Sequence, residues 1–596
     1  MADKTVRIGG ASGFWGDAAM ATPQLLADGK LDYLVYDYLA EITMSILARA
    51  RARDPQAGYA SDFVSAAMKP HLAEIARQGV KVIANAGGVN PDACAEAVRA
   101  LIAGAGLNLK VAVVRGDDLL GRKQEIAASG VVEMFSGEPF PVLGTIASIN
   151  AYLGAFPIAD ALGRGADIVI TGRCVDSAVT LGACIHEFGW GREDHDRLAG
   201  GSLAGHILEC GTQATGGNFT DWELVVDSLP EAGYPIAEIS ADGTFVCTKP
   251  ANTGGLVSVG TVAEQMLYEI GDPRAYILPD VVCDFSAVRM EQEGENRVRV
   301  SHARGYRAPS TYKVSATFAD GFRGGETWTV YGRDAERKAH KIAANALARA
   351  RSTLRQLGLA DYAETSVEVI GAEAHYGALR RAFQAREVNL KVAARHESAA
   401  AIGVLLKEFV GTALAAPPGL TGFAGGRPRP SPVVRLFSLL LPKTAVDITV
   451  DVEGEQRSCN DPLVSCDTPA APETVVPAPT VGESCVAVAL ERLAWARSGD
   501  KGDKANIGII ARRAQYLPHI WAALTTERVA LRFAHFLQGG VERFYLPGLP
   551  AINFLLHDVL GGGGMASLRT DPQGKGYAQL LLDEPILIPV TLAETL

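Results

Sequence analysis

The chain has 596 residues, which is too many for one hydrophobic core and predicts two or three domains. Its hydrophobic fraction of 48% and charged fraction of 21% are ordinary for a globular protein. A formal net charge of −11 argues against general binding to nucleic acid or to an anionic membrane. Because no apolar run reaches the length of a membrane span and no signal-like segment opens the chain, we expect a cytoplasmic protein with no membrane partner.

Strands and helices alternate through residues 1–230. Strand-like apolar runs, each followed by a polar loop and a helical pattern, cover 5–9, 31–36, 80–84, 109–114 and 166–170. Repeated strand–helix units predict an α/β region with a Rossmann-like parallel sheet and right-handed crossovers. Ligands of such sheets bind at the carboxyl ends of the strands.

Polar and glycine residues gather just after these strands. The candidate substrate-binding residues at this edge are Gly10, Ser12, Gly13, Asp17, Asn85, Gly88, Asn90, Thr171, Arg173 and Asp176, and Asp37 and Asp117 follow two further strands. Each residue alone also fits a helix cap or a turn, so the prediction depends on the loops converging at one edge. The glycines at 9, 10, 13 and 16 do not follow the GxGxxG spacing of dinucleotide sites. Carboxylates here would suit a divalent metal, yet no compact ligand spacing demands one, and we assign neither metal nor cofactor.

Residues 201–222 contain candidate catalytic residues. If 202–210 is helical, His206 and Glu209 are i, i+3 neighbours on one face. A His–Glu pair suits general acid–base catalysis, with Cys210 close enough to act as a nucleophile. The alternative is a packed helix in which Cys210 fills the core. Asn218, in the glycine-rich loop that follows, joins the binding set.

The pattern changes after residue 230. Residues 231–454 mix strands and helices without regular alternation, which predicts an α+β region. Lys249 begins another glycine-rich loop and could neutralise a substrate carboxylate or oxyanion. Prolines recur from 462 to 479 without a hydrophobic period, so we predict a surface linker over 455–483.

The last domain, 484–596, opens with the most polar motif of the chain. Residues 497–508 read RSGDKGDKANIG and lie between two apolar runs, which predicts a loop between buried elements. Its glycines could bring backbone N–H groups to an anion, Arg497 and Lys501 could add charge, and Asp500 or Asp503 could move protons. A solvated turn with internal ion pairs is the alternative. Farther along, 549–560 has the apolar composition of a helix.

This motif resembles the C-terminal module of the acyclic terpene utilisation AtuA family. Segments 7–17, 170–176, 419–423 and 553–556 resemble other stretches of the family, so the resemblance spans nearly the whole chain. It implies a small ferredoxin-like α+β fold for 484–596. It also implies a role in degrading citronellol- and geraniol-type terpenoids through CoA thioesters.

We therefore expect a cytoplasmic enzyme, a lyase or hydratase acting beside the thioester of a branched or carboxylated acyl-CoA, and a homo-oligomer. The catalytic candidates are His206, Asp500, Lys501 and Asp503, and the motif adds Arg497, Ser498 and Asn506 to the binding set. We also expect the motif to dock on the N-terminal region and complete the site. The alternatives are a non-catalytic acyl-CoA-binding or scaffolding subunit of a carboxylase or lyase complex, and a nucleotide-using ligase, for which no Walker-type loop is present.

Overall fold

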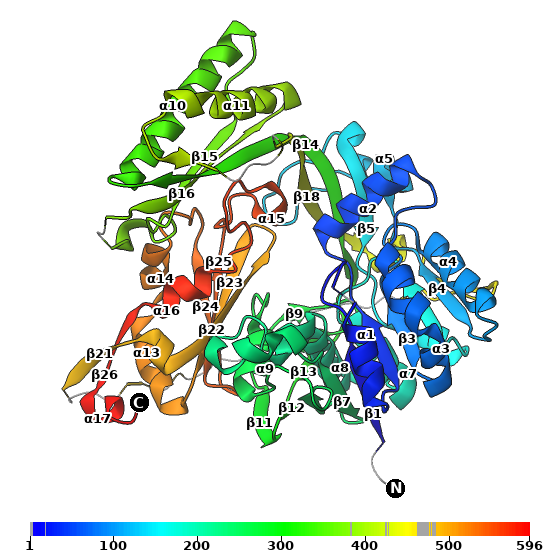
Figure 1. The fold of residues 1–596 in the computed structure, drawn as a ribbon. Coiled ribbons are helices and arrows are strands. Elements are labelled where there is room, and N and C mark those ends of the chain that lie inside the picture. The colour runs from blue at the N-terminus through cyan, green and yellow to red at the C-terminus, as the bar shows by residue number, and fades with distance from the viewer. Residues whose placement is uncertain are drawn as a thin grey trace.

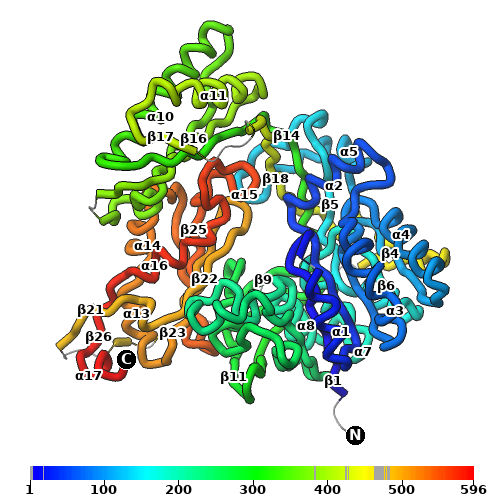
Figure 2. Tube along the Cα trace, in the orientation of Figure 1, coloured from blue at the N-terminus to red at the C-terminus, as the bar shows by residue number. Residues whose placement is uncertain are grey.

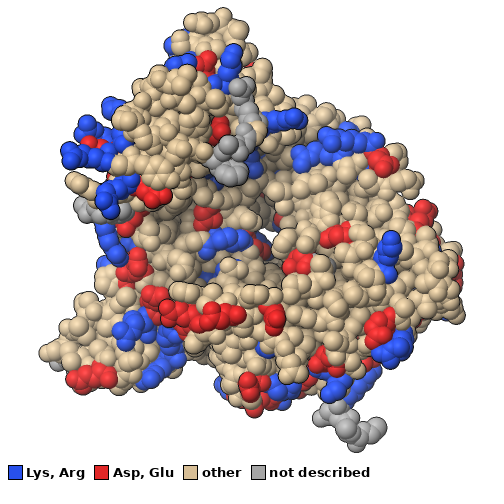
Figure 3. Space-filling view, viewed as in Figure 1, with Lys and Arg blue, Asp and Glu red and all other residues tan. Residues whose placement is uncertain are grey.

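The computed structural model describes residues 4–17, 19–381, 384–422, 426, 428–461, 476, 478, 479 and 484–596. They form a mixed α/β structure whose sheet-containing parts surround a central hollow (Figures 1 and 3). The trace in Figure 2 runs from the N-terminal part on one side of this hollow to the C-terminal part on the other. None of the helices described is both long and apolar enough to cross a membrane.

The largest sheet has parallel strands at its centre and antiparallel strands at both ends. The central strands, in spatial order, are β1 (Thr5–Gly10), β2 (Tyr33–Tyr36), β3 (Lys81–Ala84), β6 (Ile168–Thr171) and β4 (Val111–Arg115). Beyond β1 come β7 (Ile236–Ser240), β8 (Phe245–Thr248), β12 (Arg297–Ser301) and β11 (Arg289–Gly294). Beyond β4 come β19 (Thr449–Val452) and β20 (Glu455–Ser458). The predicted parallel sheet is therefore the core of a mixed one, extended by strands from 231–454.

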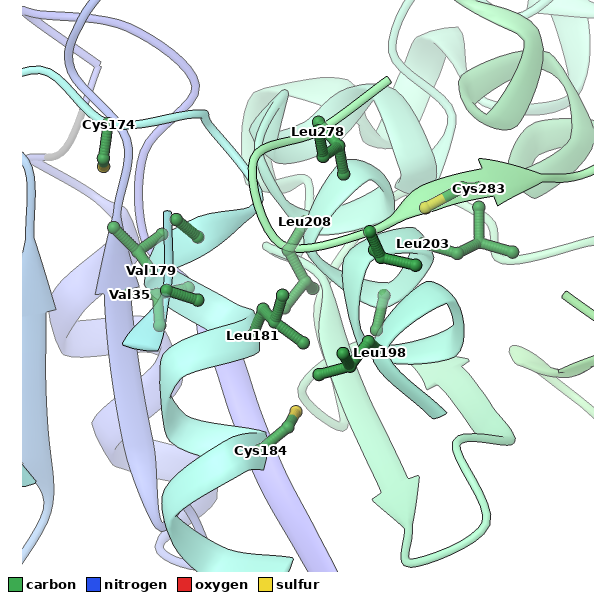
Figure 4. Close-up of a cluster of buried hydrophobic side chains, with 14 of the residues drawn as sticks. Val35, Cys174, Val179, Leu181, Cys184, Leu198, Leu203, Leu208, Leu278 and Cys283 are labelled. Atoms are coloured by element: carbon green, nitrogen blue, oxygen red, sulfur yellow. The ribbon is translucent and has the colours of Figure 1, made fainter. Parts of the chain in front are cut away.

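Helices cover both faces of this sheet. One face packs against α1 (Ala21–Asp28), α3 (Lys69–Gln78) and α4 (Pro91–Gly104), and the other against α6 (Phe156–Gly163), α7 (Ala178–Phe188) and α8 (His195–Leu208). Alternate residues of a strand consequently enter different cores: Val35 of β2 packs with α7 and α8, whereas Leu34 packs with the opposite layer. Figure 4 shows Leu181, Leu198 and Leu208 gathered between α7 and α8. Burial on both faces explains why these strands are continuous apolar runs.

A second sheet connects the upper part of the molecule to the first. Its strands are β5 (Ile146–Ala151), β14 (Thr311–Tyr331), β15 (Glu364–Ile370), β16 (Glu387–His396), β17 (Leu420–Thr421) and β18 (Ser431–Pro442), covered by α10 (Ala335–Gln356) and α11 (Ala399–Gly411). The 21 residues of β14 reach roughly 70 Å, and the strand runs from one part to the other (Figure 1). A bulge between Ala319 and Phe322 interrupts the pairing of β14 with β18.

The C-terminal part contains a four-stranded antiparallel sheet in the order β22 (Ala494–Lys501), β23 (Lys504–Ala511), β25 (Ala551–Leu556) and β24 (Val541–Leu546). Around it lie β21 (Cys485–Ala489), β26 (Pro585–Pro589), α13 (Leu517–Ala523), α14 (Thr526–Arg532) and α16 (Tyr577–Leu582). The helix predicted over 549–560 is wrong, since the middle of this segment is β25, one of the two inner strands of the sheet. All six of its residues are buried, and a continuous apolar run fits a buried strand and a buried helix equally well.

The first residues of the predicted linker belong to the folded structure. Residues 455–458 form β20 and pair with β19, and Asp461 is buried in an ion pair with Lys443, 3.2 Å away. Residues 462–475, 477 and 480–483 lie outside the described residues. The linker prediction is therefore wrong for 455–461.

The remaining elements are short or lie near the hollow. They are α2 (Glu41–Arg53), α5 (Lys123–Ala128), α9 (Val259–Leu267), β9 (Tyr276–Ile277), β10 (Val282–Asp284), β13 (Arg304–Tyr306), α12 (Leu490–Leu493), α15 (Gly563–Ala566) and α17 (Val590–Ala593).

Candidate functional site

The polar motif of the C-terminal domain is a β-hairpin, not the predicted loop. Strands β22 and β23 pair from Ala494–Ala511 to Lys501–Lys504, leaving Gly502 and Asp503 as the turn. Gly502 has a φ of 68° and occupies the first turn position, as a type II′ hairpin requires. Because β23 pairs with β22 on one side and β25 on the other, its N–H groups serve the sheet. They do not form the anion-binding nest that the glycines suggested.

The glycines at 499 and 508 permit close packing instead. A Cβ added at Gly499 would lie 2.6 Å from Tyr268 Cε2, and one at Gly508 would lie 2.5 Å from the Cβ of Leu267. Both contacts are shorter than a van der Waals separation, so only glycine lets β22 and β23 lie directly on the end of α9. The hairpin therefore packs on α9, in 231–454, and it also contacts residues 1–230, where Arg497 Nη2 donates to Gln213 Oε1. Completion of a site by this docking stays a prediction.

Two buried asparagines fix this contact. Asn506 Nδ2 donates to Leu267 O (2.6 Å) and to Asn553 Oδ1 (3.0 Å), while its Oδ1 accepts from the Glu269 N–H (2.9 Å). Asn553 Nδ2 in turn donates to Ile270 O at 2.8 Å. Asn506 was expected to bind substrate, but these bonds engage both ends of its amide. Glu269, held in this way, has a φ of 60°, a strained value for a residue with a side chain.

The loops after the parallel strands leave the sheet at one edge, as the sequence predicted. Asn85 donates to Asp37 Oδ1 through its Nδ2 and accepts from the Tyr38 N–H at 2.8 Å. Burial and the nearby carboxylates of Asp176 and Glu209 raise the pKa of Asp37 well above its ordinary value.

The buried Arg173 and the half-buried Asp176 form an ion pair at the same edge. Arg173 Nη1 lies 2.6 Å from Asp176 Oδ1, and the guanidinium stacks 4.2 Å above the Tyr152 ring centroid. The Arg173 N–H donates to Asp117 Oδ2 (2.8 Å), and burial raises the pKa of Asp117 to about 7. Sheet topology thus places five of the predicted polar residues together, namely Asp37, Asn85, Asp117, Arg173 and Asp176.

The first glycine loop lies against the end of α8. A Cβ at Gly10 would meet Leu208 O at 2.8 Å, and one at Gly13 would meet the carbonyl carbon of Cys210 at 2.8 Å. Ser12 Oγ donates to Asp37 O (2.9 Å), and Asp17 Oδ2 accepts from the Gly13 N–H (2.9 Å). Ser12 and Asp17 therefore stabilise the conformation of the loop through hydrogen bonds to the backbone.

Other members of the predicted binding set have local structural contacts. Asn90 caps α4 and donates to Ala57 O, and Thr171 Oγ1 donates to the adjacent carbonyl of Gly172. Gly88 has a φ of 55° and packs against Leu47 and Gly58, Lys249 Nζ donates to Thr253 O, and Asn218 is exposed with a φ of 60°. The structure does not bring these residues to the Arg173–Asp176 pair through any contact described.

His206 is buried beside Glu209, which follows the last turn of α8. Its Nε2 lies 3.1 Å from Met266 O, and its Nδ1 lies 2.8 Å from Glu209 Oε1. A carbonyl only accepts, so Nε2 carries a proton, and one further proton is shared between Nδ1 and Oε1. Burial lowers the pKa of His206, but Glu209 outweighs burial and raises it, so the pair holds this proton tightly. Glu209 Oε2 has no hydrogen-bond partner among the described residues.

Lys501, next to the hairpin turn, interacts through its charge with Asp176 and Glu209. Its Nζ lies 5.9 Å from the ring centroid of Tyr276, whose ring lies 5.8 Å from that of His206. Burial alone would lower the pKa of Lys501, but Tyr276, Glu269 and Asp176 raise it above its ordinary value. The Lys501 residue is nevertheless exposed to solvent along part of its surface.

The other residues of the motif point elsewhere. Arg497 donates to Gln213 Oε1 and stacks on Tyr268, and Ser498 Oγ donates to Gly574 O (2.6 Å) inside the C-terminal domain. Asp503 Oδ1 accepts from the Leu560 N–H at 3.0 Å. Asp503 therefore holds the glycine loop 561–564, and no contact described connects it to the carboxylates around Lys501.

Asp500 belongs to an ionic cluster that sequence reasoning missed. Lys575 Nζ lies 3.1 Å from Asp500 Oδ1 and 3.2 Å from Glu269 Oε1, and it donates to the Tyr268 hydroxyl. Burial and Glu269 raise the pKa of Asp500, and Lys575 opposes this rise. The signal for Lys575 was its position between two glycines, the same composition as the motif.

A family model described as "Acyclic terpene utilisation family protein AtuA" matches residues 6–452. The chain belongs to the AtuA family. A second model, the AtuA ferredoxin-like domain, matches residues 488–587, so the predicted C-terminal domain of this AtuA-family chain is confirmed. Membership implies a part in acyclic terpene utilisation. No curated protein and no solved structure matches the chain.

Within the described part of this AtuA-family chain, no three His, Cys, Asp or Glu side chains are grouped so that they could hold a metal ion. Its candidate site is instead a set of carboxylates, Asp37, Asp176 and Glu209, approached by cations from two domains. Such a set can move protons and stabilise a developing negative charge.

Proposed function

We propose that the chain is a lyase or hydro-lyase that acts beside the thioester of a branched or carboxylated acyl-CoA in acyclic terpenoid breakdown. The observation that supports this most directly is the placement of Lys501. The hairpin places Lys501 Nζ 5.9 Å from the Tyr276 ring centroid, near enough to Asp176 and Glu209 of the N-terminal part for its charge to interact with theirs. The C-terminal domain supplies the cation and the N-terminal part supplies the two carboxylates, so this site needs both parts.

Lys501 suits the stabilisation of an oxyanion. Addition or elimination of water and retro-aldol cleavage both place negative charge on the thioester oxygen. Because its pKa is raised, Lys501 stays protonated and donates hydrogen bonds to such an oxygen. The same charge state argues against imine formation, which needs a neutral amine.

Glu209 suits proton transfer in the same reaction. Its Oε1 shares a proton with His206, and its Oε2 is left without a partner among the described residues. A proton taken from a substrate carbon at Oε2 is compensated by movement of the shared proton toward His206 Nδ1. In this scheme Glu209 touches the substrate and His206 is a positioning residue, which differs from the direct role predicted for the histidine.

The test is incubation of the full chain with a panel of acyl-CoA thioesters, followed by mass spectrometry for gain or loss of one water or of an acetyl unit. Lys501→Met should lower kcat by about 100- to 1000-fold, as for loss of an oxyanion donor. Lys504→Met is the matched control, because Lys504 lies opposite Lys501 across the hairpin and its Nζ lies 4.6 Å from the Phe135 ring centroid.

The alternative is a non-catalytic acyl-CoA-binding or scaffolding subunit. Exposed apolar side chains on the β21–β26 pair favour it, since Leu587 is 62% and Val486 41% exposed. Binding of acyl-CoA by the parent chain with no turnover of any thioester, unchanged by Lys501→Met, would support this alternative and refute the enzyme proposal.

A further inference from the structure

A small pocket adjoins Arg173 on the N-terminal side of the site. Side chains of α2, β5 and β14 line it together with Tyr152 and Arg173, and those used below are Glu41, Ser148, Asn150, Tyr152, Arg173 and Thr317. About 10 Å³ of this pocket is open to the centre of a water-sized group, which is about the least that one water molecule needs. The pocket therefore takes a single group of hydroxyl size.

Two polar atoms of its lining have no hydrogen-bond partner among the described residues: Arg173 Nε and Asn150 Oδ1. Both residues are only 3% exposed. The rest of each side chain is engaged, because Arg173 Nη1 donates to Asp176 Oδ1 (2.6 Å) and Asn150 Nδ2 donates to Asp117 Oδ2 (2.9 Å). A ligand that accepts from the Nε–H and donates to Oδ1 would satisfy both atoms.

The charges around the pocket are already paired. Arg173 pairs with Asp176, and Lys313 Nζ lies 3.7 Å from Glu41 Oε1. Tyr152 also donates to Glu41 at 2.7 Å. An additional carboxylate or ammonium would be a buried charge without a counterion, so a neutral ligand is favoured.

We propose that this pocket is a subsite for one neutral hydroxyl-sized group, held by Arg173 Nε and Asn150 Oδ1. That group is either a water molecule or a hydroxyl of the substrate. Its part in catalysis rests on the proposed function, because addition or elimination of water needs a defined place for this oxygen. Arg173 connects the pocket to the reaction site through Asp176, which contributes to the charge around Lys501.

The first test is crystallographic and does not depend on activity. Crystals of the full chain should show an oxygen at about 2.7–3.2 Å from both Arg173 Nε and Asn150 Oδ1. Soaking with methanol should place the alcohol oxygen there, and soaking with formate should not place the anion there. Formate in the pocket, or density for neither water nor methanol, would overturn the proposal.

The second test concerns catalysis. Thr317→Ile replaces the Thr317 hydroxyl, which bonds to Ser148 Oγ at 2.7 Å, by a longer ethyl group at the pocket wall. It should exclude methanol and reduce kcat by about tenfold with little change in KM. Thr365→Ile, on β15 of the same sheet and outside the pocket, is the matched control and should behave like the parent. Unchanged kcat in a folded Thr317→Ile variant would overturn the catalytic role. If no acyl-CoA is turned over, the proposed function fails, while the soaks of the parent chain still decide whether the subsite binds a hydroxyl group.

Discussion

Replacing Gly508 by alanine tests whether the motif glycines serve domain packing. The added Cβ would lie 2.5 Å from the Cβ and 2.8 Å from Cδ1 of Leu267. The Cβ of Leu267 is fixed to the backbone, and β23 is bonded to a strand on each side, so neither partner can yield locally. Overpacking of this kind costs about 1–3 kcal/mol. We expect this loss at the contact between the hairpin and the end of α9.

Hydrogen exchange is the appropriate assay, because a chain with several domains does not unfold in one step. The Glu269 N–H donates to Asn506 Oδ1 across this contact (2.9 Å). A loss of about 1–3 kcal/mol corresponds to exchange about 5- to 150-fold faster in peptides that contain this amide. Gly540→Ala is the control, since no heavy atom lies within 4 Å of its added Cβ. Exchange in Gly508→Ala equal to that of the parent would show that packing does not explain the glycine.

Three further predictions concern buried charges. Lys575→Met leaves the Asp500 carboxylate without its cation and should reduce turnover by about tenfold, measured with the substrate found in the panel; full activity would remove Lys575 from the site. Burial raises the pKa of Asp117 to about 7, so its contribution to stability is complete below about pH 4 and is lost as the pH rises to 7. The melting temperature of Asp117→Asn relative to the parent should therefore rise between these pH values, and a constant difference would contradict the burial argument. Burial alone would raise the pKa of Glu368, but hydrogen bonds from neighbours such as Lys391 outweigh burial and lower this pKa to about 2. The contribution of Glu368 to folding stability is therefore present above about pH 4.5 and is lost in acid. Glu368→Gln should flatten the acid side of the melting profile, and an unchanged slope there would refute this.

Sequence patterns predicted the parallel strands well, because residues buried on both faces must be apolar throughout. They also predicted the edge where Asp37, Asn85 and Arg173 gather, since parallel strands all end on the same side. The patterns failed at β25, where a buried strand and a buried helix have the same composition, and at 455–461, which joins the first sheet through β20.

The motif at 497–508 shows most clearly that composition does not reveal the roles of single residues. Its composition indicated a functional segment and its resemblance to the AtuA family was confirmed, but composition could not separate residues that face the hollow from residues that hold the hairpin. In a strand, alternate side chains point to opposite faces, and this alternation decides which residues face the hollow. Because the segment was expected to be a loop, the alternation rule was not applied to it. Lys501 faces the carboxylates, whereas Ser498 and Asp503 bond within their own domain.

By itself, the sequence determined the family, the parallel strands and the edge at which polar loops converge, because local apolar periodicity and chain order are sufficient for these. The tertiary structure alone decided that the charge of Lys501 interacts with those of Asp176 and Glu209, and that Lys575 and Glu269 join Asp500. These groups lie far apart in the sequence, and the contacts that bring them together include the packing of glycines on α9 and the asparagine hydrogen bonds across the domain contact, which local sequence patterns do not reveal.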